Sequence, residues 1–132
     1  MREIKFRVWD KEKNMWTNFK ILDNIMYFMD KNTGVWFHEK YKAKGRFALM
    51  QYTGIKDKND VEIYEGDLVL IRIDKTNILH KTVVKFKHGA FIADIIGNND
   101  YIYLFHFGFN KDDFEVIGNI YENPELLEGK NG

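Results

Sequence analysis

The chain contains no serine, no cysteine and a single proline. The hydroxyl and thiol nucleophiles that hydrolytic enzymes use most often are therefore missing, and neither a Ser-His-Asp nor a Cys-His arrangement can form. The lack of cysteine also excludes disulfides and thiolate metal sites, which suits a reducing cytoplasm. No glycine-rich phosphate loop of either common spacing is present. These absences predict a protein that is not an enzyme and carries no cofactor.

Long hydrophobic runs are missing as well. No stretch approaches the roughly 18 apolar residues that a membrane helix needs. Residues 1–7 alternate charged and apolar side chains, and no apolar signal-peptide core follows them. We therefore expect a cytoplasmic protein without membrane contacts.

An excess of positive charge is also absent. The 132 residues carry 20 Lys and Arg against 20 Asp and Glu, so the formal net charge is zero. A general nucleic-acid binder would show a basic excess, because phosphate neutralisation supplies much of its affinity. Any nucleic-acid surface must therefore be local. Aromatic residues make up 16% of the chain, which favours a packed core or an interface over disorder.

Short alternating or β-branched segments, separated by turn residues, predict a mainly β protein. We expect strands within residues 4–8, 15–16, 25–29, 35–37, 48–52, 68–73, 82–87, 90–95, 101–109 and 114–121. The predicted architecture is a set of N-terminal hairpins packed with a small C-terminal SH3-like barrel. Asn123, Pro124 and Glu125 predict a short helical turn near the end, with Asn as its cap. The length predicts one domain, 1–132, with subdomains 1–47 and 48–127.

Three blocks of sequence carry a family resemblance. They are the opening MREIKFRVWD of residues 1–10, the central LMQYTGIKDKN of residues 49–59 with EIYEGD at 62–67, and IGNIYENPELL at 117–127. Together they resemble the YopX family of phage and prophage proteins over nearly the whole chain. One departure is Asp60, where the family usually has Gly. Asp tolerates left-handed backbone geometry better than most residues, so the turn can survive.

The resemblance implies an origin in the phages and prophages of low-GC bacteria, and a mainly β fold. It brings no established catalytic or ligand-binding residue to transfer. The matching blocks are interpreted as structural turns, because each keeps Gly, Asn or Asp where the backbone must reverse. The predicted structural positions are Gly54, Asn59, Gly66, Asp67, Gly118 and Pro124. Gly118 lies inside the last predicted strand, where a glycine indicates a bulge.

Histidines and carboxylates offer the remaining enzymatic alternative, a metal-dependent hydrolase. The histidines at positions 38, 80, 88 and 106 form no short metal motif, so we favour surface or packing roles. Glu62, Glu65 and Asp67 gather around a tight turn and could bind a divalent cation. We favour turn chemistry there, with Asp67 accepting hydrogen bonds from nearby backbone amides.

A basic stripe is predicted at Lys40, Lys42, Lys44 and Arg46. On an extended strand these side chains would share one face and could hold the phosphates of a nucleotide or nucleic acid, while nearby aromatic rings stack on bases. The alternative is a solvated face. Only four of the 20 basic residues are arginines, which disfavours sequence-specific reading of DNA bases.

In the segment 101–109 every odd-numbered residue is aromatic, and the even-numbered residues include Ile102 and Leu104. A strand formed by this segment would therefore be apolar on both faces. A strand of that kind must be covered on both faces, by a subunit interface or by the rest of the chain. The candidate interface residues are Tyr101, Tyr103, Phe105, Phe107 and Phe109. The leading hypothesis is a non-catalytic phage accessory protein that acts through protein–protein contacts as a homo-oligomer. The alternative is a protein that binds or sequesters a nucleotide or nucleic acid through the basic stripe and aromatic rings; host or phage proteins are further partners.

Overall fold

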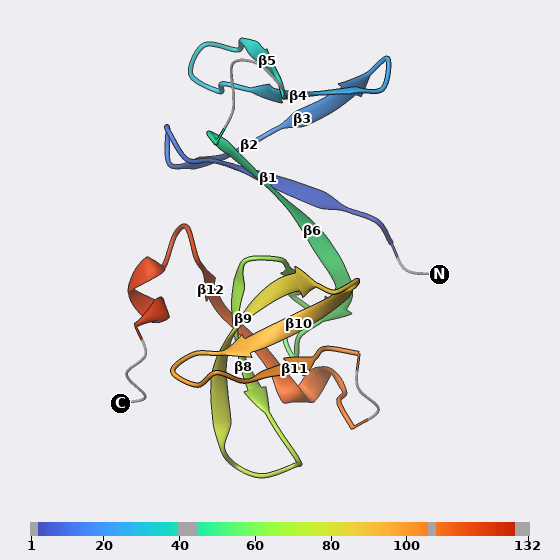
Figure 1. Ribbon diagram of the computed structural model, residues 1–132, viewed down its shortest axis with the longest axis vertical. Helices are drawn as coiled ribbons and strands as arrows, with labels where there is room; N and C mark the ends of the chain where they lie inside the picture. Colours follow the sequence, from blue (N-terminus) through green and yellow to red (C-terminus); the bar gives the residue numbers. More distant parts are fainter. Residues whose placement is uncertain (1–2, 40–44, 106–107, 129–132) are drawn as a thin grey trace. The chain divides into compact units, whose positions relative to one another are not determined.

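The computed structural model describes residues 3–39, 45–105 and 108–128 and is drawn in Figure 1. Nearly all of its elements are strands, so the predicted mainly β fold is confirmed. The strands are β1 Phe6–Asp10, β2 Met15–Thr17, β3 Phe19–Leu22, β4 Ile25–Met29, β5 Trp36–His38, β6 Phe47–Lys56, β7 Glu62–Tyr64, β8 Asp67–Arg72, β9 Leu79–Lys87, β10 Ala90–Ile95, β11 Tyr101–Tyr103 and β12 Phe114–Asn119. The two short 3-10 helices are η1 Lys111–Asp113 and η2 Pro124–Leu127.

The chain divides into two compact units. The N-terminal unit comprises residues 5–51, and the C-terminal unit comprises residues 52–132 together with residues 1–4. The division falls inside β6, as does the subdomain boundary expected from the sequence after residue 47.

The N-terminal unit contains two antiparallel sheets. In one, β1 lies between β2 and the first half of β6; in the other, the order is β3-β4-β5. The hairpin loop predicted after β1 is present, and Asp10 stabilises it by accepting hydrogen bonds from the amides of Glu12 and Lys13. Asp30 does the same for Asn32 and Thr33 after β4. The buried apolar residues of this unit are Val8, Trp9, Phe28 and Met50.

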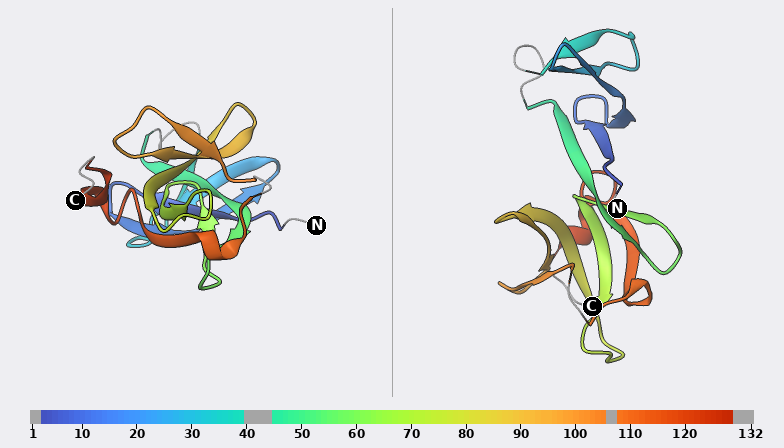
Figure 2. Two further views of the ribbon diagram at one scale, coloured as in Figure 1. Left: turned by 90° about the horizontal axis from the view of Figure 1, so that it is seen from below. Right: turned by 90° about the vertical axis from the view of Figure 1, so that its right-hand side faces the viewer.

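The C-terminal unit is built on a five-stranded antiparallel sheet in the order β11-β10-β9-β8-β12. Its curvature is visible in the right-hand view of Figure 2. The main core cluster is Ile63, Val69, Ile71, Val84, Phe91, Ala93, Leu104 and Phe114. On the opposite face of the sheet, Leu68 of β8 and Val83 of β9 belong to a second cluster. Leu126 of η2 packs against this cluster. Burial on both faces explains why β8 is a continuous apolar run.

Two strand predictions and one cap prediction need correction. The predicted strand 101–109 is shorter in the described residues: β11 ends at Tyr103, and Leu104, whose amide still bonds to the Phe91 carbonyl, and Phe105 lie beyond it. Strand β3 was not predicted, because its Phe-Lys-Ile-Leu sequence has no clear period of two. At η2, Asn123 does not cap; its side chain accepts instead from the amide of Asn119.

The turn predictions divide into true turns and bulges. Gly66, with φ of 84°, reverses the chain between β7 and β8, and Asp60 adopts the left-handed φ of 62° that its position requires. Asn59 lies in the same turn as Asp60 and donates its amide to Asp57. Gly54 lies instead within β6, where the pairing with β7 shifts register, and Gly118 lies at a register shift in β12. Both glycines therefore serve β-bulges, which confirms the bulge predicted at Gly118 and corrects the turn predicted at Gly54.

Candidate functional site

Arg46 is the centre of a charged cluster in the N-terminal unit. Its Nη2 lies 2.7 Å from Asp10 Oδ2 and 2.8 Å from Asp30 Oδ2, and its Nε donates to Asp10 Oδ1 at 2.9 Å. The Asp10 side chain is fully buried, while those of Asp30 and Arg46 are 7% and 12% exposed. The guanidinium carbon also lies 5.2 Å and 4.8 Å from the ring centroids of Phe37 and Phe47. Arg46, which precedes β6, thereby links the end of β1 at Asp10 to the residue that follows β4, Asp30.

The ionisation of this cluster follows from these contacts. Burial raises the pKa of Asp10, but hydrogen bonds from Arg46 and from the loop amides outweigh it, so that the pKa is lowered. The hydrogen bond from Arg46 lowers the pKa of Asp30, and the hydrogen bond to Asp10 raises that of Arg46. All three groups are therefore charged at neutral pH and hold one another.

This arrangement bears on the predicted basic stripe. Arg46 is its only described member, and its fork of donors already pairs with three carboxylates, Asp10, Asp30 and the exposed Glu12. The other three members, Lys40, Lys42 and Lys44, lie outside the described residues. The phosphate-binding role of the stripe stays a prediction.

One face of the β3-β4-β5 sheet gathers aromatic rings and a cation. Strand pairing places Lys20 opposite Tyr27 and Tyr27 opposite His38, and it pairs Met29 with Trp36 two residues further along. Because paired residues and residues two apart share a face, all five side chains project to the same side. We call Lys20, Tyr27, Trp36 and His38 the aromatic face. Lys20 is exposed and the three rings are half-buried.

The edge of the five-stranded sheet is a second surface of interest. Strand β11 ends the sheet, and its Tyr101 and Tyr103 are 44% and 48% exposed. Phe105, which keeps their parity, is 57% exposed, whereas Leu104 of the other parity is buried. Phe109 packs against the core cluster and its ring lies 5.3 Å from that of Phe114. Phe107 lies outside the described residues. Of the predicted interface residues, three therefore form an exposed set and Phe109 does not join them.

A groove of about 510 Å³ runs along this edge. Its lining residues are Arg72, Ile73, Asp74, Lys75, Tyr101, Ile102, Tyr103, Gly108 and Phe109. Successive strand residues point to opposite faces, so a groove that contacts all three residues of β11 must follow the edge of the strand. The Leu104 amide bonds to β10, and by the alternation of an antiparallel ladder the backbone groups of Tyr103 point to the outer edge.

The charged rim of the groove is internally balanced. The buried carboxylate of Asp113 receives Lys75 Nζ at 2.8 Å and Arg72 Nη2 at 3.0 Å. Burial raises the pKa of Asp113, but the bonds from Lys75, the Asn110 amide and Arg72 outweigh it and lower the pKa. Asp113 is therefore an ionised anchor for η1 and not a proton donor. The hydrogen bond with Tyr103 raises the pKa of Tyr101, so the Tyr101 hydroxyl is protonated at neutral pH.

The candidate metal residues are not brought together in the part of the chain that the structure describes. There, no group of three or more His, Asp or Glu is placed to hold a metal ion. His38, His80 and His88 lie on β5, on β9 and in the turn after β9, and His106 is outside the described residues. Asp67 Oδ2 accepts from the Tyr64 amide at 2.7 Å, as its predicted turn role requires.

The structure also identifies surface residues that the sequence did not single out. Lys20, Tyr27 and Trp36 form one face only because strand β3, which was not predicted, joins the sheet. The parity of Tyr27 and Met29, and of Trp36 and His38, was a usable signal. Arg72 and Lys75 reach Asp113 from 41 and 38 residues away, a separation that no local pattern reveals.

These features define a mainly antiparallel β protein of two units, with exposed aromatic surfaces on both. The model of the YopX protein family matches residues 5–128, and the chain belongs to this family. It is 29% identical over 135 residues to the SPbeta prophage-derived uncharacterized protein YopX of Bacillus subtilis (strain 168), an alignment that covers 94% of this chain and 96% of that protein. None of the described helices is long and apolar enough to cross a membrane.

Two crystal structures resemble the fold over almost its full length. That of protein yopX from Bacillus subtilis is 27% identical, with a TM-score of 0.59, and covers 97% of this chain and 100% of that one. That of protein EF1440 from Enterococcus faecalis is 25% identical, with a TM-score of 0.54 and the same coverage. The family predicted from the three sequence blocks is confirmed.

Proposed function

We propose that this chain is a non-catalytic accessory protein of prophage origin, which acts in the host cytoplasm through protein–protein contacts and pairs with a second copy of itself. The prophage origin rests on the related protein of Bacillus subtilis, whose name assigns it to a prophage. The non-catalytic role is supported by the absence of serine and cysteine nucleophiles.

The observation that carries the pairing is the exposed edge of β11. Its three residues, Tyr-Ile-Tyr, include no charge and no proline, the usual devices that protect an edge strand. The strand is short, so an added strand would form few backbone bonds there. Most of the association energy would come from burying Tyr101, Tyr103 and Phe105, residue types that interfaces favour.

Electrostatics favours a second copy at this surface. The C-terminal unit carries 10 Lys and Arg against 15 Asp and Glu, so two such units repel one another over most of their surfaces. Along the groove the charges balance locally, because Arg72 and Lys75 pair with the buried Asp113 and the acidic Asp74 lines the same groove. The aromatic edge can meet itself without juxtaposing like charges, and a two-fold axis would bury it on both copies.

Light scattering after size exclusion tests this pairing at micromolar concentration. We expect twice the 15.8 kDa chain mass for the natural protein, and the monomer mass for Tyr103→Lys, which places a cation in the contact. Ile78→Lys is the matched control, because Ile78 is 63% exposed and is not one of the residues that line the groove, so it should leave the dimer intact. A monomeric natural protein, or a dimer that tolerates Tyr103→Lys, would refute the proposal.

A second candidate function, binding of a nucleotide or nucleic acid, is favoured by the partition of charge between the units. The N-terminal unit carries 10 Lys and Arg against 5 Asp and Glu, a net charge of +5 that the −5 of the C-terminal unit cancels. The zero net charge of the chain is therefore the sum of a basic N-terminal unit and an acidic C-terminal unit. Its overall test is whether the full chain binds a labelled oligonucleotide with an affinity that falls as salt rises.

A further inference from the structure

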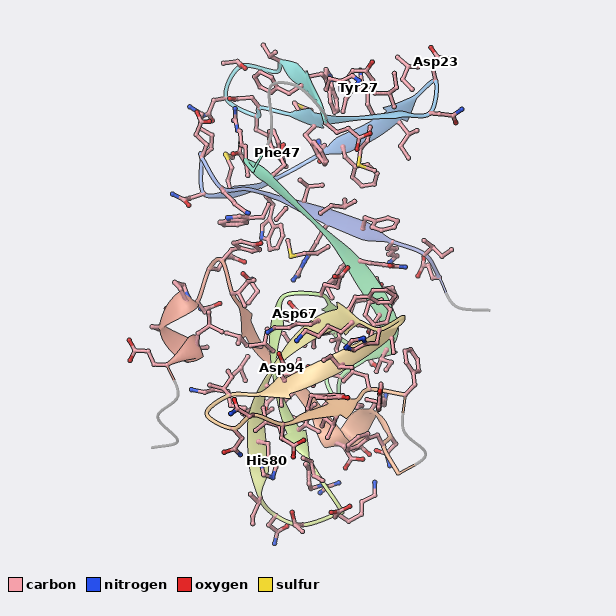
Figure 3. All side chains as sticks on the ribbon, in the orientation of Figure 1. Asp23, Tyr27, Phe47, Asp67, His80 and Asp94 are labelled. Atoms are coloured by element: carbon pink, nitrogen blue, oxygen red, sulfur yellow. The ribbon has the colours of Figure 1, made fainter. Side chains whose placement is uncertain are left out.

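The β3-β4-β5 sheet is aromatic on both faces, and the two faces have different roles. Phe19, Phe28 and Phe37 form one cross-strand row. Phe28 is buried and stacks on Phe47 with ring centroids 5.0 Å apart. Figure 3 places Phe47, at the start of β6, on the opposite side of β4 from Tyr27. The phenylalanine row therefore makes the interior of the unit, and the aromatic face is the other side.

The rings of the aromatic face are held in an ordered arrangement. Tyr27 and His38 meet edge to face with centroids 5.6 Å apart. Lys20 Nζ lies 4.3 Å from the centroid of Trp36 and 6.0 Å from that of Tyr27. Such a cation lies over the flat side of a ring. Lys20 therefore occupies the position over Trp36 that a planar group could take. Its flexible side chain lets the ammonium move aside.

We infer that the aromatic face is a stacking surface for single-stranded nucleic acid. This inference rests on the second candidate function and assigns its site. Half-exposed rings on a rigid sheet accept unpaired bases of any sequence, because every base has a flat aromatic surface. A base that stacks on Trp36 would displace the Lys20 ammonium toward the adjoining phosphate. The net charge of +5 of the unit supplies the attraction at longer range.

The same features disfavour other ligands. The bases of a duplex are stacked on one another and cannot reach Trp36 and Tyr27. A purely electrostatic polyanion would gain from Lys20 but nothing from the rings. A stacking surface therefore separates unpaired nucleic acid from both a duplex and a sulfated polysaccharide.

Fluorescence anisotropy with a labelled oligothymidylate tests the inference, with a duplex and heparin as comparison ligands. For the full chain we expect Trp36→Ala to weaken oligothymidylate binding about tenfold and heparin binding little, because one stacked base is lost. Trp36→Phe keeps a ring and should retain most of the affinity. Phe86→Ala is the matched aromatic control, since Phe86 is 50% exposed on β9 of the acidic C-terminal unit, belongs to neither proposed surface and should change nothing.

Lys20→Glu keeps the test decisive if Trp36→Ala disturbs the sheet. Lys20 is exposed, so this variant should fold normally; we expect weaker oligothymidylate binding and a salt dependence reduced by about one phosphate contact. If oligothymidylate binds but Trp36→Ala and Lys20→Glu leave it unchanged, or if heparin and oligothymidylate respond alike to Trp36→Ala, the site is refuted while the second candidate function survives. If neither oligothymidylate nor duplex binds, both are refuted.

Discussion

The two units are stabilised by different physical means. In the N-terminal unit, the fully buried Asp10 and the nearly buried Asp30 share one guanidinium, and aromatic rings pack around it. In the C-terminal unit, an apolar cluster of eight buried residues fills one side of the sheet. A small sheet with few apolar residues can gain order from a shared charge, but its stability then depends on ionisation. The larger apolar core lacks that dependence, so ionisation in the C-terminal unit bears mainly on the Asp113 anchor of η1.

The sequence provides separate probes for the two units. All three tryptophans, Trp9, Trp16 and Trp36, belong to the N-terminal unit. Tryptophan fluorescence therefore reports unfolding of that unit alone. Hydrogen exchange of amides in β8, β9 and β10 reports the C-terminal unit.

The largest expected effect is Phe91→Ala in the C-terminal core. Phe91 is 2% exposed, so its removal should leave a cavity and cost about 4 kcal/mol. Amide exchange in β8 to β10 should accelerate accordingly, while the fluorescence transition in urea moves less. Phe86→Ala is the control, because Phe86 contacts the Phe91 ring but is 50% exposed. Equal shifts of both probes would show that the contrast between the units does not extend to their stability.

Arg46→Met should have the next largest effect, and in the opposite unit. It leaves the buried Asp10 carboxylate without its cation, at a cost of about 3 kcal/mol. The fluorescence transition should move to lower urea, with amide exchange in β8 to β10 little changed. Adding Asp10→Asn should restore part of the loss, because the unpaired charge disappears. Lys11→Met, which removes an exposed cation nearby, is the control, and a loss as large as that of Arg46→Met would count against the cluster.

Acid should affect the N-terminal unit through the same cluster. The folded-state pKa values of Asp10 and Asp30 lie below the usual 3.8, so their ion pairs contribute stability that is present above that pH. This stability is lost as the pH falls through the lowered values. The free energy of unfolding, measured in urea by tryptophan fluorescence, should therefore stay constant near neutrality and fall below pH 3.8.

The Arg46→Met variant supplies the control for this acid response. Without the cation, only the hydrogen bonds from the loop amides oppose the effect of burial on the pKa of Asp10, so the acid response of the variant should be weaker than that of the natural chain. An acid response of the same sign and steepness in the natural chain and in Arg46→Met would contradict the assignment to this cluster.

Gly118→Ala in β12 should have the smallest effect, about 1 kcal/mol. A methyl group at this bulge would clash with Oδ1 of Asn123 and lie 2.7 Å from its Cγ, so the Asn123 side chain would have to shift and weaken its bond with the Asn119 amide. Thermal unfolding of the C-terminal unit measures the loss. Gly89→Ala is the comparison, because Gly89 also has a positive φ but nothing within 4 Å of an added Cβ. A larger loss for Gly89→Ala would show that backbone strain outweighs the contact.

Local patterns were enough for most of the fold. The β-branched run of β8, the hairpin at His88 and Gly89, and the left-handed turn at Asp60 were all visible in the sequence. The end of β11 was not, because Leu104 and Phe105 continue the same alternation after the strand pairing has stopped. Strand β3 was missed for the converse reason: its strand character comes from pairing with β4 and not from its own pattern.

The surfaces were less predictable than the fold. Tyr101, Tyr103 and Phe105 could be proposed from their parity, and the structure shows them exposed. The aromatic face could not be proposed, because Lys20, Tyr27 and Trp36 come from three separate strands. The role of Arg46 was also hidden: a cation in a lysine-rich segment resembles a solvated charge until two distant carboxylates approach it.

By itself, the amino-acid sequence determined the strand-rich composition, the turns, the lack of serine and cysteine nucleophiles and the family, because these depend on residue types and their near neighbours. Tertiary structure alone decided which charges are buried together, which edge of the sheet stays open and which rings share a face. Those properties depend on strand register and burial, and both arise only when residues far apart in the chain meet.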